Sequence, residues 1–585
     1  MSQNSMLEPE IQKRVQEWLH PPFDEKTRQE VQELIQQGPE AIRDAFYTSL
    51  SFGTGGMRGL MGAGTTRMNQ YTVRMATEGL AKYILKQKIT NPSVFIGFDS
   101  RHHSPFFARQ AAEVLALHGI KVYLLKNLRP TPFISFGCRQ KKCTAAIMIT
   151  ASHNPAVYNG YKVYWSDGGQ VVAPHDTGIL QEVQAIGSFQ KIKLSSPDDR
   201  HIEILDEELD EPYLKAIHPL QLFPEENKRY GKGLKIVYTS LHGTGITLCP
   251  LALMDWGFSS IQYVEEQIIP DGDFPTVKFP NPEYKETLSL GIETLLQTEA
   301  DLLIANDPDA DRTGIAVMHH GKACILTGNE VASLCVDHIA RTLQERKKLP
   351  EMGAFVTTIV SSDLIGTIAK SYGAHCFEVL TGFKYIGELI HLWESSNDGY
   401  QFLFGAEESY GFLLGTHSRD KDAIVSSCLI SEIALQAKRD GKTLLDRLYG
   451  LYQKHGIFRE QQLAIDFKPG KEGMDEMASY MSRQRKNPLK AILGKKAVSI
   501  EDYKTRIRCD LISGKQEALT LPKSDVLLYR FEDGSKIVVR PSGTEPKIKI
   551  YAGVRHHHKQ IELGIQECDK KLDELLASMK KELTS

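Results

Sequence analysis

The chain has 585 residues, of which 41% are hydrophobic and 24% are charged. These values are typical of soluble globular proteins and exclude a disordered or fibrous chain. Because one hydrophobic core cannot serve so long a chain, we expect several domains, with about four as the working number. The 70 basic and 73 acidic residues give a net charge of −3, so no strong positive field favours a nucleic-acid partner.

The cysteines and the apolar segments bear on the cellular compartment. The nine cysteines are scattered, odd in number and without a Cys-x-x-Cys pair, which favours reduced thiols and a cytoplasmic location. Residues 1–13 are polar and do not resemble a secretory signal. The most apolar helical segment, 423–437, contains Glu432 and is shorter than the ~20 residues of a membrane span, so we expect no membrane partner.

The first third of the chain predicts an α/β domain. A charged helical segment at 9–44 precedes a glycine-rich loop at 51–62 that contains Arg58, a cation suited to an anion. A strand at 94–98, a helix at 104–118 and a strand at 122–125 form a βαβ pattern, and the apolar run 145–149 predicts a further buried strand. This pattern predicts a largely parallel sheet with working loops at the carboxyl ends of its strands.

The same pattern restarts twice. Residues 187–210 are rich in Ser, Pro, Asp and Glu and indicate a hinge or boundary. The second round has strands at 234–239, 261–265 and 300–305, with a glycine-containing loop at 240–245. The third round has a helix at 329–341 and strands at 354–360, 376–380 and 401–405. We therefore expect three α/β units with mixed sheets.

The last part of the chain differs in pattern. Strands at 461–467, 525–531, 536–539 and 547–552 resemble hairpins, and a charged helix at 560–582 closes the chain. This order predicts an α+β domain with an antiparallel sheet. The expected domains are residues 1–210, 211–322, 323–455 and 456–585.

Ser152 is a candidate nucleophile. It follows the buried strand 145–149 and lies next to His153, in a loop that ends at Pro155. A hydroxyl presented on such a turn is one way to build a covalent intermediate. A serine at this position is equally well explained as a turn residue or a helix cap.

Asp307, Asp309 and Asp311 form a candidate metal site after the strand 300–305. On an extended loop, alternate side chains project to one side and converge on one cation. Oxygen ligands suit a hard divalent ion, Mg²⁺ before Ca²⁺. The glycine and the distal glutamate of an EF-hand loop are missing, and a solvated acidic turn is the alternative.

Two further loops carry groups that recognise sugars and phosphates. The run Arg540 to Pro546 combines an arginine, two hydroxyls and a glycine, with Lys547 and Lys549 on the next strand, which favours phosphate. Glu407 and Glu408 end a strand, where carboxylates can accept hydrogen bonds from vicinal sugar hydroxyls. A solvated surface loop is the alternative for this acidic pair.

Together these four motifs, in this order and spacing, resemble the alpha-D-phosphohexomutase superfamily. The resemblance spans Gly53 to Tyr551 and implies four domains around one central cleft. Ala156 to Lys162 replaces the glycine pair of the best-known pattern, and one extra residue separates Ser409 from Lys421. Both details are similar to the branch with bacterial phosphoglucomutases and phosphopentomutases.

The resemblance implies roles for the matching positions. Ser152 would be the phosphoserine, with His153 as a supporting group, and its phosphate would share Mg²⁺ with the three aspartates. The other implied residues are Arg58 and Arg312 for phosphate and substrate near the transfer centre, Thr381, Glu407 and Ser409 for the sugar, Lys421 near the reacting hydroxyl, and Arg540, Ser542, Gly543 and Thr544, supported by Lys549, for the phosphate that does not react.

The implied activity is an isomerase that interconverts glucose 1-phosphate and glucose 6-phosphate, with glucose 1,6-bisphosphate as intermediate and activator. Mannose or pentose phosphates, and a synthase that releases the sugar 1,6-bisphosphate, are the alternatives within enzymes. A sugar-phosphate-binding protein without catalysis is the third alternative, although it would need neither the nucleophile nor three metal carboxylates. The partner is a small sugar phosphate, and a monomer or weak homo-oligomer is expected.

Overall fold

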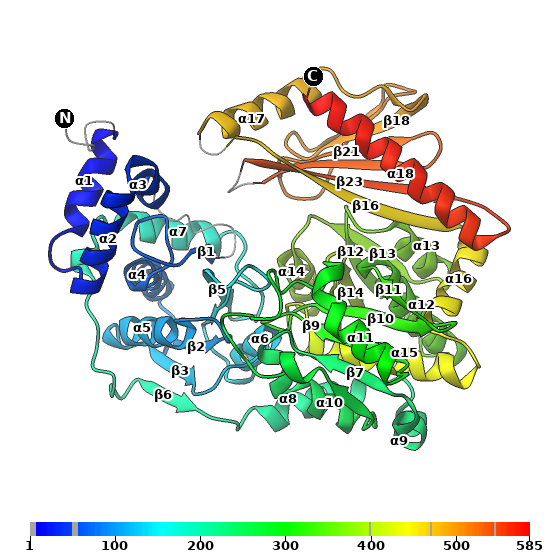
Figure 1. The fold of residues 1–585 in the computed structure, drawn as a ribbon, viewed down its shortest axis with the longest axis horizontal. Helices are drawn as coiled ribbons and strands as arrows, with labels where there is room; N and C mark the ends of the chain where they lie inside the picture. The colour runs from blue at the N-terminus through cyan, green and yellow to red at the C-terminus, as the bar shows by residue number, and fades with distance from the viewer. Residues whose placement is uncertain (1–6, 49–55, 397–398, 469–470, 543–545, 585) are drawn as a thin grey trace. The chain divides into compact units, whose positions relative to one another are not determined.

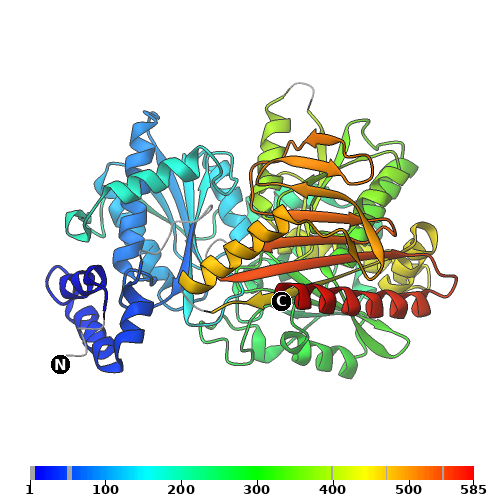
Figure 2. The ribbon, with the colours of Figure 1, turned by 90° about the horizontal axis from the view of Figure 1, so that it is seen from above.

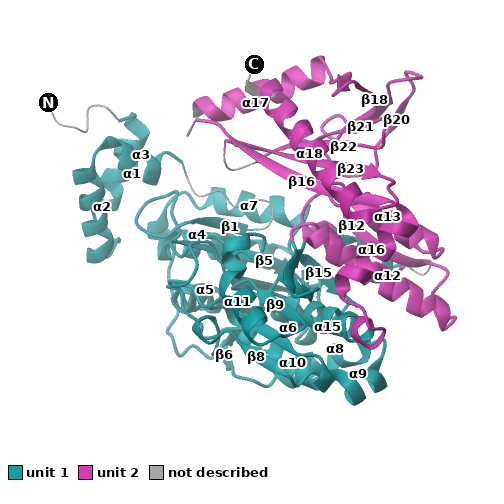
Figure 3. Ribbon diagram, turned by 45° about the vertical axis from the view of Figure 1, so that its right-hand side comes forward, with its two compact units in different colours: residues 1–326, 386–399, 410–436 teal, residues 327–385, 400–409, 437–585 magenta. Residues whose placement is uncertain are grey.

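The structure is a computed structural model that describes residues 7–48, 56–396, 399–468, 471–542 and 546–584. It divides into two compact units (Figure 3). Unit 1 comprises residues 1–326, 386–399 and 410–436, and unit 2 comprises residues 327–385, 400–409 and 437–585.

Three helices open unit 1 and form a small apolar core of their own. They are α1 (Pro9–Trp18), α2 (Glu25–Gln37) and α3 (Pro39–Phe46). Trp18 is fully buried and its ring contacts Phe23, Phe46 and Tyr71, so this helical segment packs onto the start of the next helix, α4 (Gln70–Lys86). The charged helical segment that the sequence predicts at 9–44 is confirmed.

The first sheet of unit 1 is mixed and has the strand order β1-β5-β4-β2-β3-β6. Strands β2, β3, β4 and β6 are parallel, and β5 and β1 are antiparallel to their neighbours. Its apolar core includes α4 and α5 residues and the strands themselves. The elements are β1 (Gly56–Leu60), β2 (Ser93–Phe98), α5 (Ser104–Leu117), β3 (Lys121–Leu125), α6 (Thr131–Gln140), β4 (Ala145–Ile149), β5 (Tyr158–Trp165), α7 (His175–Ala185) and β6 (Ile202–Leu205) (Figure 1).

The second sheet of unit 1 has the order β11-β10-β9-β7-β8, with β7 parallel to both β8 and β9. Strands β9, β10 and β11 are antiparallel to one another, so the sheet is mixed as well. Its elements are α8 (Asp210–Ile217), α9 (Pro224–Tyr230), β7 (Ile236–Thr239), α10 (Cys249–Asp255), β8 (Ile261–Tyr263), α11 (Ser289–Gln297), β9 (Leu302–Asn306), β10 (Thr313–His319) and β11 (Lys322–Leu326), and the later segments of the unit add most of α14 (Phe383–Glu394), β15 (Gly411–Leu414) and most of α15 (Ala423–Arg439).

Unit 2 begins with a third α/β arrangement, in which β12 is parallel to β13 and to β14. β12 is buried along its whole length, which explains its continuous apolar and β-branched sequence. The elements are α12 (Gly328–Glu345), β12 (Gly353–Thr358), α13 (Asp363–Ser371), β13 (His375–Val379), β14 (Gln401–Glu407) and α16 (Leu444–His455). The side chain of Thr327 caps the N-terminus of α12 in a capping box with Glu330.

The C-terminal part of unit 2 is an antiparallel sheet with the order β16-β23-β22-β21-β18-β19-β20, and β17 pairs with β18. The closing helix, α18, runs along this sheet and packs on β16 and β23 (Figure 2). The elements are β16 (Ile457–Asp466), α17 (Lys471–Lys486), β17 (Ala491–Ile492), β18 (Lys495–Asp502), β19 (Ile507–Asp510), β20 (Gln516–Ala518), β21 (Leu527–Phe531), β22 (Lys536–Pro541), β23 (Lys547–His556) and α18 (Ile561–Thr584).

The fold class is confirmed: three α/β arrangements with mixed sheets precede an α+β part with an antiparallel sheet. The polar segment 187–210 is not only a connection, because residues 202–205 form β6, which pairs in parallel with β3 at the sheet edge. The nine cysteines are free thiols. Within the described ranges, no helix combines the length and apolar character needed to cross a membrane.

Candidate active site

Ser152 lies in a tight loop just after the carboxyl end of β4. Its backbone adopts a left-handed conformation with φ of 52°, which costs free energy for a residue with a Cβ and is maintained by surrounding contacts. Its backbone N–H donates to the Thr150 hydroxyl at 2.8 Å, and the residue is only 3% exposed. The loop therefore presents one buried hydroxyl in a fixed position.

Arg101, in the loop that follows β2, binds the loop that contains Ser152. Its guanidinium donates to the carbonyl oxygens of Ser152 at 2.6 Å, Pro155 at 2.8 Å and Tyr158 at 3.0 Å, and to that of Asn154. Burial lowers the pKa of Arg101 to about 10, so the group is still a cation near neutral pH. Because β2 and β4 are parallel neighbours, the loop after β2 brings Arg101 to the same sheet edge as Ser152.

The acidic loop Asp307 to Asp311 follows β9. The three aspartates are at most 1% exposed, and one carboxylate oxygen from each lies within 4.8 Å of the other two. Gly243, in the glycine-containing loop after β7, packs directly on this loop, since a Cβ there would meet the Cα of Pro308 at 2.2 Å. The convergence that the alternating spacing predicts is therefore present, in a buried loop rather than a solvated turn.

The charges of the three carboxylates are only partly compensated. Burial and repulsion from Asp309 and Asp311 raise the pKa of Asp307 well above its usual value. Burial also opposes ionisation of Asp311, but Lys421 and Lys162 hold the pKa of that carboxyl below its usual range. The negative potential of the loop is thus strongest at Asp307, where it opposes ionisation of the carboxyl.

These residues fit a divalent cation. The Oδ1 atoms of Asp309 and Asp311 are buried and have no hydrogen-bond partner among the residues that the structure describes. Buried carboxylate oxygens without partners are costly unless a cation contacts them. Three carboxylates form the all-oxygen donor set that hard divalent ions prefer.

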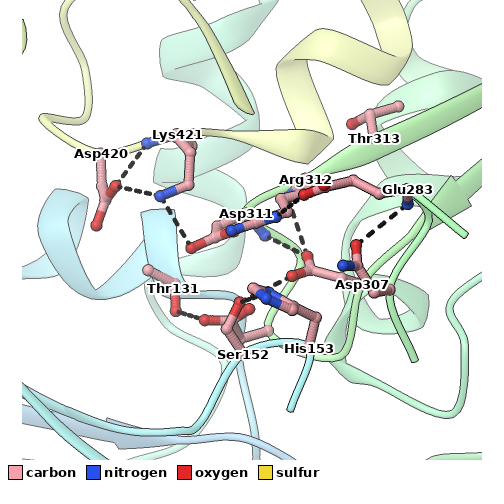
Figure 4. Close-up of polar contacts among 12 residues, drawn as sticks. Thr131, Ser152, His153, Glu283, Asp307, Asp311, Arg312, Thr313, Asp420 and Lys421 are labelled. Carbon is pink, nitrogen blue, oxygen red and sulfur yellow. Dashed lines mark hydrogen bonds and ion pairs between the residues drawn. The ribbon is translucent and has the colours of Figure 1, made fainter. Parts of the chain in front are cut away.

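The nucleophile candidate and the acidic loop meet directly. The Ser152 hydroxyl donates to Oδ2 of Asp307 at 3.0 Å and lies 3.1 Å from Nδ1 of His153 (Figure 4). Burial, together with the nearby Arg312 and Arg58, lowers the pKa of His153 well below its usual value, so the imidazole is neutral at neutral pH. A phosphate on Ser152 would carry its charge to the place where the three carboxylates converge.

Three predicted cations surround this centre. The Nη1 of Arg58 donates to Oδ1 of Asn154, two residues beyond Ser152, at 2.9 Å. Arg312 pairs with Glu283 through Nη1, and its Nε lies 3.7 Å from Oδ1 of Asp311. Lys421 places Nζ 3.3 Å from Oδ2 of Asp311 and 3.4 Å from Oδ1 of Asp420 (Figure 4).

Unit 2 carries the predicted sugar-binding residues. Oε1 of Glu407, at the end of β14, accepts a hydrogen bond of 2.9 Å from the backbone N–H of Gly382. This contact joins the Glu407 loop to the loop of Thr381, whose hydroxyl oxygen is buried without a hydrogen-bond partner in the described part of the chain. Ser409 follows in the same turn and is half-buried. Glu408 turns instead toward Thr358, with a distance of 3.2 Å between Oε2 and the hydroxyl.

The predicted phosphate loop is also in unit 2. Arg540, the next-to-last residue of β22, lies opposite Lys549 on β23, so the two cations are neighbours across a strand pair. The backbone N–H of Ser542 donates to the carbonyl of Lys547 at 2.8 Å. Gly543 and Thr544 lie outside the described residues.

Sequence reasoning did not assign Lys162 and Thr131 to the site. Lys162, on β5, donates from Nζ to Oδ2 of Asp309 at 2.8 Å and to Oδ2 of Asp311 at 3.1 Å. Thr131, at the start of α6, donates from its hydroxyl to Oδ2 of Asp309 at 2.8 Å. The available signal for Lys162 was a single cation inside a strand rich in aromatic residues, where a buried charge requires an acidic partner.

The chain resembles known proteins over most of its length. It is 37% identical to the phosphoglucomutase of Staphylococcus epidermidis over 528 residues, which cover 89% of this chain and 94% of the relative. It is 38% identical to the phosphoglucomutase of Staphylococcus aureus over 525 residues, or 89% and 92%. The chain belongs to the phosphoglucomutase/phosphomannomutase family.

Matches to the four domains of the family follow one another along the chain. Residues 49–190, 211–321 and 327–453 match the alpha/beta/alpha domains I, II and III of phosphoglucomutase/phosphomannomutase, and residues 476–569 match its C-terminal domain. The fold resembles that of parafusin, a phosphoglucomutase from Paramecium, with a TM-score of 0.67 and 18% identity over 90% of this chain and 95% of the other. This order confirms the alpha-D-phosphohexomutase resemblance that the four motifs indicate.

Proposed function

We propose that this family member is a phosphosugar mutase that interconverts glucose 1-phosphate and glucose 6-phosphate. The observation that carries the proposal is the 3.0 Å contact between the Ser152 hydroxyl and Asp307 in a buried loop of three aspartates. The similarity to phosphoglucomutases over 89% of the chain favours glucose over mannose or pentose phosphates and over a bisphosphate synthase.

Phosphoryl transfer occurs in two steps in this proposal. A phosphorylated Ser152 gives its phosphoryl group to a free hydroxyl of the sugar monophosphate: the P–Oγ bond breaks and a P–O bond to the sugar forms. The sugar hydroxyl loses its proton to a base, and Oγ of Ser152 takes up a proton. The product is glucose 1,6-bisphosphate. After the intermediate reorients, its other phosphoryl group returns to Ser152, and the isomeric monophosphate is released.

The residues around Ser152 support positioning and charge stabilisation, which dominate catalysis of phosphoryl transfer. Arg101 fixes the loop of the nucleophile through backbone carbonyls. Arg58 and Arg312 supply cations for the transferring group. Lys421, whose Nζ lies 3.3 Å from Asp311, would reach the sugar hydroxyl near the acidic loop.

We further propose Mg²⁺ as the resident ion, with Asp307, Asp309, Asp311 and a phosphate oxygen on Ser152 as its ligands. The buried Oδ1 atoms of Asp309 and Asp311, which accept no hydrogen bond within the described part of the chain, support this assignment. When bound, the ion would offset negative charge on the transferring phosphoryl group. Glucose 1,6-bisphosphate would act as activator because it can rephosphorylate Ser152.

The residues of unit 2 complete the proposed substrate contacts. Thr381, Glu407 and Ser409 would bind sugar hydroxyls, and Arg540, Ser542, Gly543 and Thr544, with Lys549, would bind the phosphate that does not react. The strand pairing of Arg540 with Lys549 supports an anion site at this position. We also propose four domains, with the limits 1–210, 211–322, 323–455 and 456–585. A cytoplasmic location is part of the same proposal and is supported by the nine free thiols.

A coupled assay tests the proposal. Purified protein with Mg²⁺ is expected to convert glucose 1-phosphate to glucose 6-phosphate, faster with a trace of glucose 1,6-bisphosphate. Mannose, pentose and hexosamine 1-phosphates are compared in parallel. Absence of glucose 6-phosphate both with and without the bisphosphate would refute the mutase assignment, whereas net accumulation of the bisphosphate from another phosphoryl donor would favour the synthase.

A further inference from the structure

A basic pocket lies within unit 1 at the other end of the sheet from Ser152. Its volume is about 620 Å³, within the range of small-molecule sites. Lys142 and Cys143, which line it, directly precede β4, whereas Ser152 follows that strand. At ~3.3 Å per residue, the five residues of β4 separate the two locations by ~17 Å.

Two arginines meet in this pocket and share one carboxylate. Arg419 pairs with Oε2 of Glu394 through Nη2, and Nη2 of Arg139 lies 3.6 Å from the same oxygen. Arg419 is 1% exposed, and burial together with the charge of Arg139 lowers its pKa to about 10. The side chain of Glu394 is 42% exposed, and Asp167 is the second acid that lines the pocket, so two acids face the two guanidinium groups and Lys142.

Polar atoms in the pocket have unused hydrogen-bonding capacity. The Nε of Arg419 and the Nδ1 of His417 are buried without a hydrogen-bond partner among the described residues. Both residues line the pocket, together with the exposed Lys142 and with His391. A buried guanidinium N–H without an acceptor is costly, and an anion with several oxygens would satisfy it.

We propose that this pocket binds the phosphate group of a small phosphorylated metabolite, at a site separate from the Ser152 centre. Phosphate fits better than carboxylate because its oxygens can accept from more of the convergent donors, which come from Arg139, Lys142 and Arg419. The volume leaves space for the remainder of the ligand against Phe136. The proposal concerns a second site and does not depend on which sugar the enzyme isomerises.

The pocket is linked to the active site through one short segment. The backbone N–H of Arg419 donates to the Ser135 hydroxyl at 2.8 Å, and the next residue, Asp420, accepts from the Tyr164 hydroxyl at 2.8 Å. Lys421 then reaches Asp311. Residues 419–421 therefore run from the pocket to the acidic loop alongside β5, which gives an anion in the pocket a route to influence Lys421.

Calorimetric titration with inorganic phosphate tests the site. The R139Q/K142Q variant is expected to lose one class of phosphate sites, with at least tenfold weaker binding, because two charged donors are removed. The single K142Q variant changes an exposed residue and so retains the fold; it is expected to weaken the same site by a smaller factor. K141Q is the matched control, since the Lys141 ammonium lies over the Tyr123 ring and does not line the pocket.

Selenate, a phosphate mimic with an anomalous X-ray signal, locates the site in crystals of the full chain. An anomalous peak between Arg139 and Arg419 is expected. Identical phosphate isotherms for the wild type, K142Q and R139Q/K142Q would overturn the proposal, as would selenate peaks only at other places. Binding of acetate but not phosphate at the pocket would overturn the assignment to phosphate.

Discussion

The Ser152 hydroxyl lies 3.0 Å from Oδ2 of Asp307, although 155 positions separate the two residues. The contact joins loops after β4 and β9, which belong to different sheets of unit 1. A serine that donates to a buried carboxylate with a raised pKa is placed where a phosphate would bring further negative charge. The three converging carboxylates and a phosphate on Ser152 would together need a cation to balance their charge.

Replacing Ser152 by alanine is expected to abolish isomerisation while preserving the fold. Loss of a catalytic nucleophile typically lowers kcat by at least ~10³-fold. The measurement is glucose 6-phosphate formation with the bisphosphate present, together with a thermal melt. S100A is the matched control, since it removes a nearby buried hydroxyl that has no hydrogen-bond partner within the described residues. Wild-type activity in S152A would refute the phosphoserine mechanism.

Replacing Asp307 by asparagine is expected to stabilise the metal-free protein and to abolish activity. In EDTA, removal of one of three converging buried charges relieves repulsion from Asp309 and Asp311. We expect Tm to rise by about 2–4 °C, which corresponds to ~1 kcal/mol for a domain of 150–250 residues.

Added Mg²⁺ should raise the Tm of the wild type and much less that of D307N, because a bound ion stabilises only the folded state. D273N, at an exposed aspartate, is the control and should behave as the wild type in both buffers. A Mg²⁺-induced shift of equal size in D307N would argue against the acidic loop as the metal site.

Much of the fold was predictable because its strands are buried and apolar. The strand 145–149 is predicted with its observed limits, since all five residues are buried and polar loops flank them. Strands β6 and β20 were not predicted for the opposite reason, although the buried strands β5 and β10 were not predicted either. β20 has only exposed residues, so no apolar alternation marks it, and β6 lies inside a polar connecting segment with one buried residue.

The candidate site was predictable where its functional residues lie close together in the sequence. Asp307, Asp309 and Asp311 alternate within one loop, and this spacing predicts that they converge. The structure brings them together through a turn at 308–310, in which the N–H of Ala310 donates to the carbonyl of Asp307 at 2.8 Å, rather than through an extended chain. Lys162 contacts two of them from a distant strand, and the sequence around a buried lysine does not indicate which acid it will pair with. The role of Arg101 is equally hidden, because it binds backbone carbonyls, which every residue possesses.

Replacing Lys162 by methionine is expected to destabilise the protein strongly in the absence of metal. Its ammonium is the donor to both Asp309 and Asp311, and removing one partner of a buried ion pair typically costs about 3–5 kcal/mol. Urea unfolding in EDTA measures the loss, and Mg²⁺ should restore part of it. K121M, at the half-buried first residue of β3, where Lys121 pairs with Glu203, is the control. Unfolding midpoints equal to those of the wild type would show that Lys162 does not balance these charges.

Glu460 is expected to make unit 2 less stable as pH rises. Burial raises the pKa of Glu460 from 4.5 to about 7, although Lys536 and Arg459 oppose the shift. Its side chain accepts from Nδ2 of Asn329 at 3.2 Å. Between pH 4.5 and 7 the folded state therefore binds more protons than the unfolded state, so the free energy of unfolding falls with rising pH in this window.

At ~1.4 kcal/mol per pH unit, the loss is at most about 3.5 kcal/mol and is complete above pH 7. E460Q, which cannot ionise, should remove this dependence, so that the variant gains stability relative to the wild type at pH 7.5 but not at pH 4.5. Urea unfolding at the two pH values measures the difference, with E476Q at an exposed position as the control. If E460Q and the wild type lose equal stability over this range, another group carries the pH dependence, because a neutral amide has no proton to release.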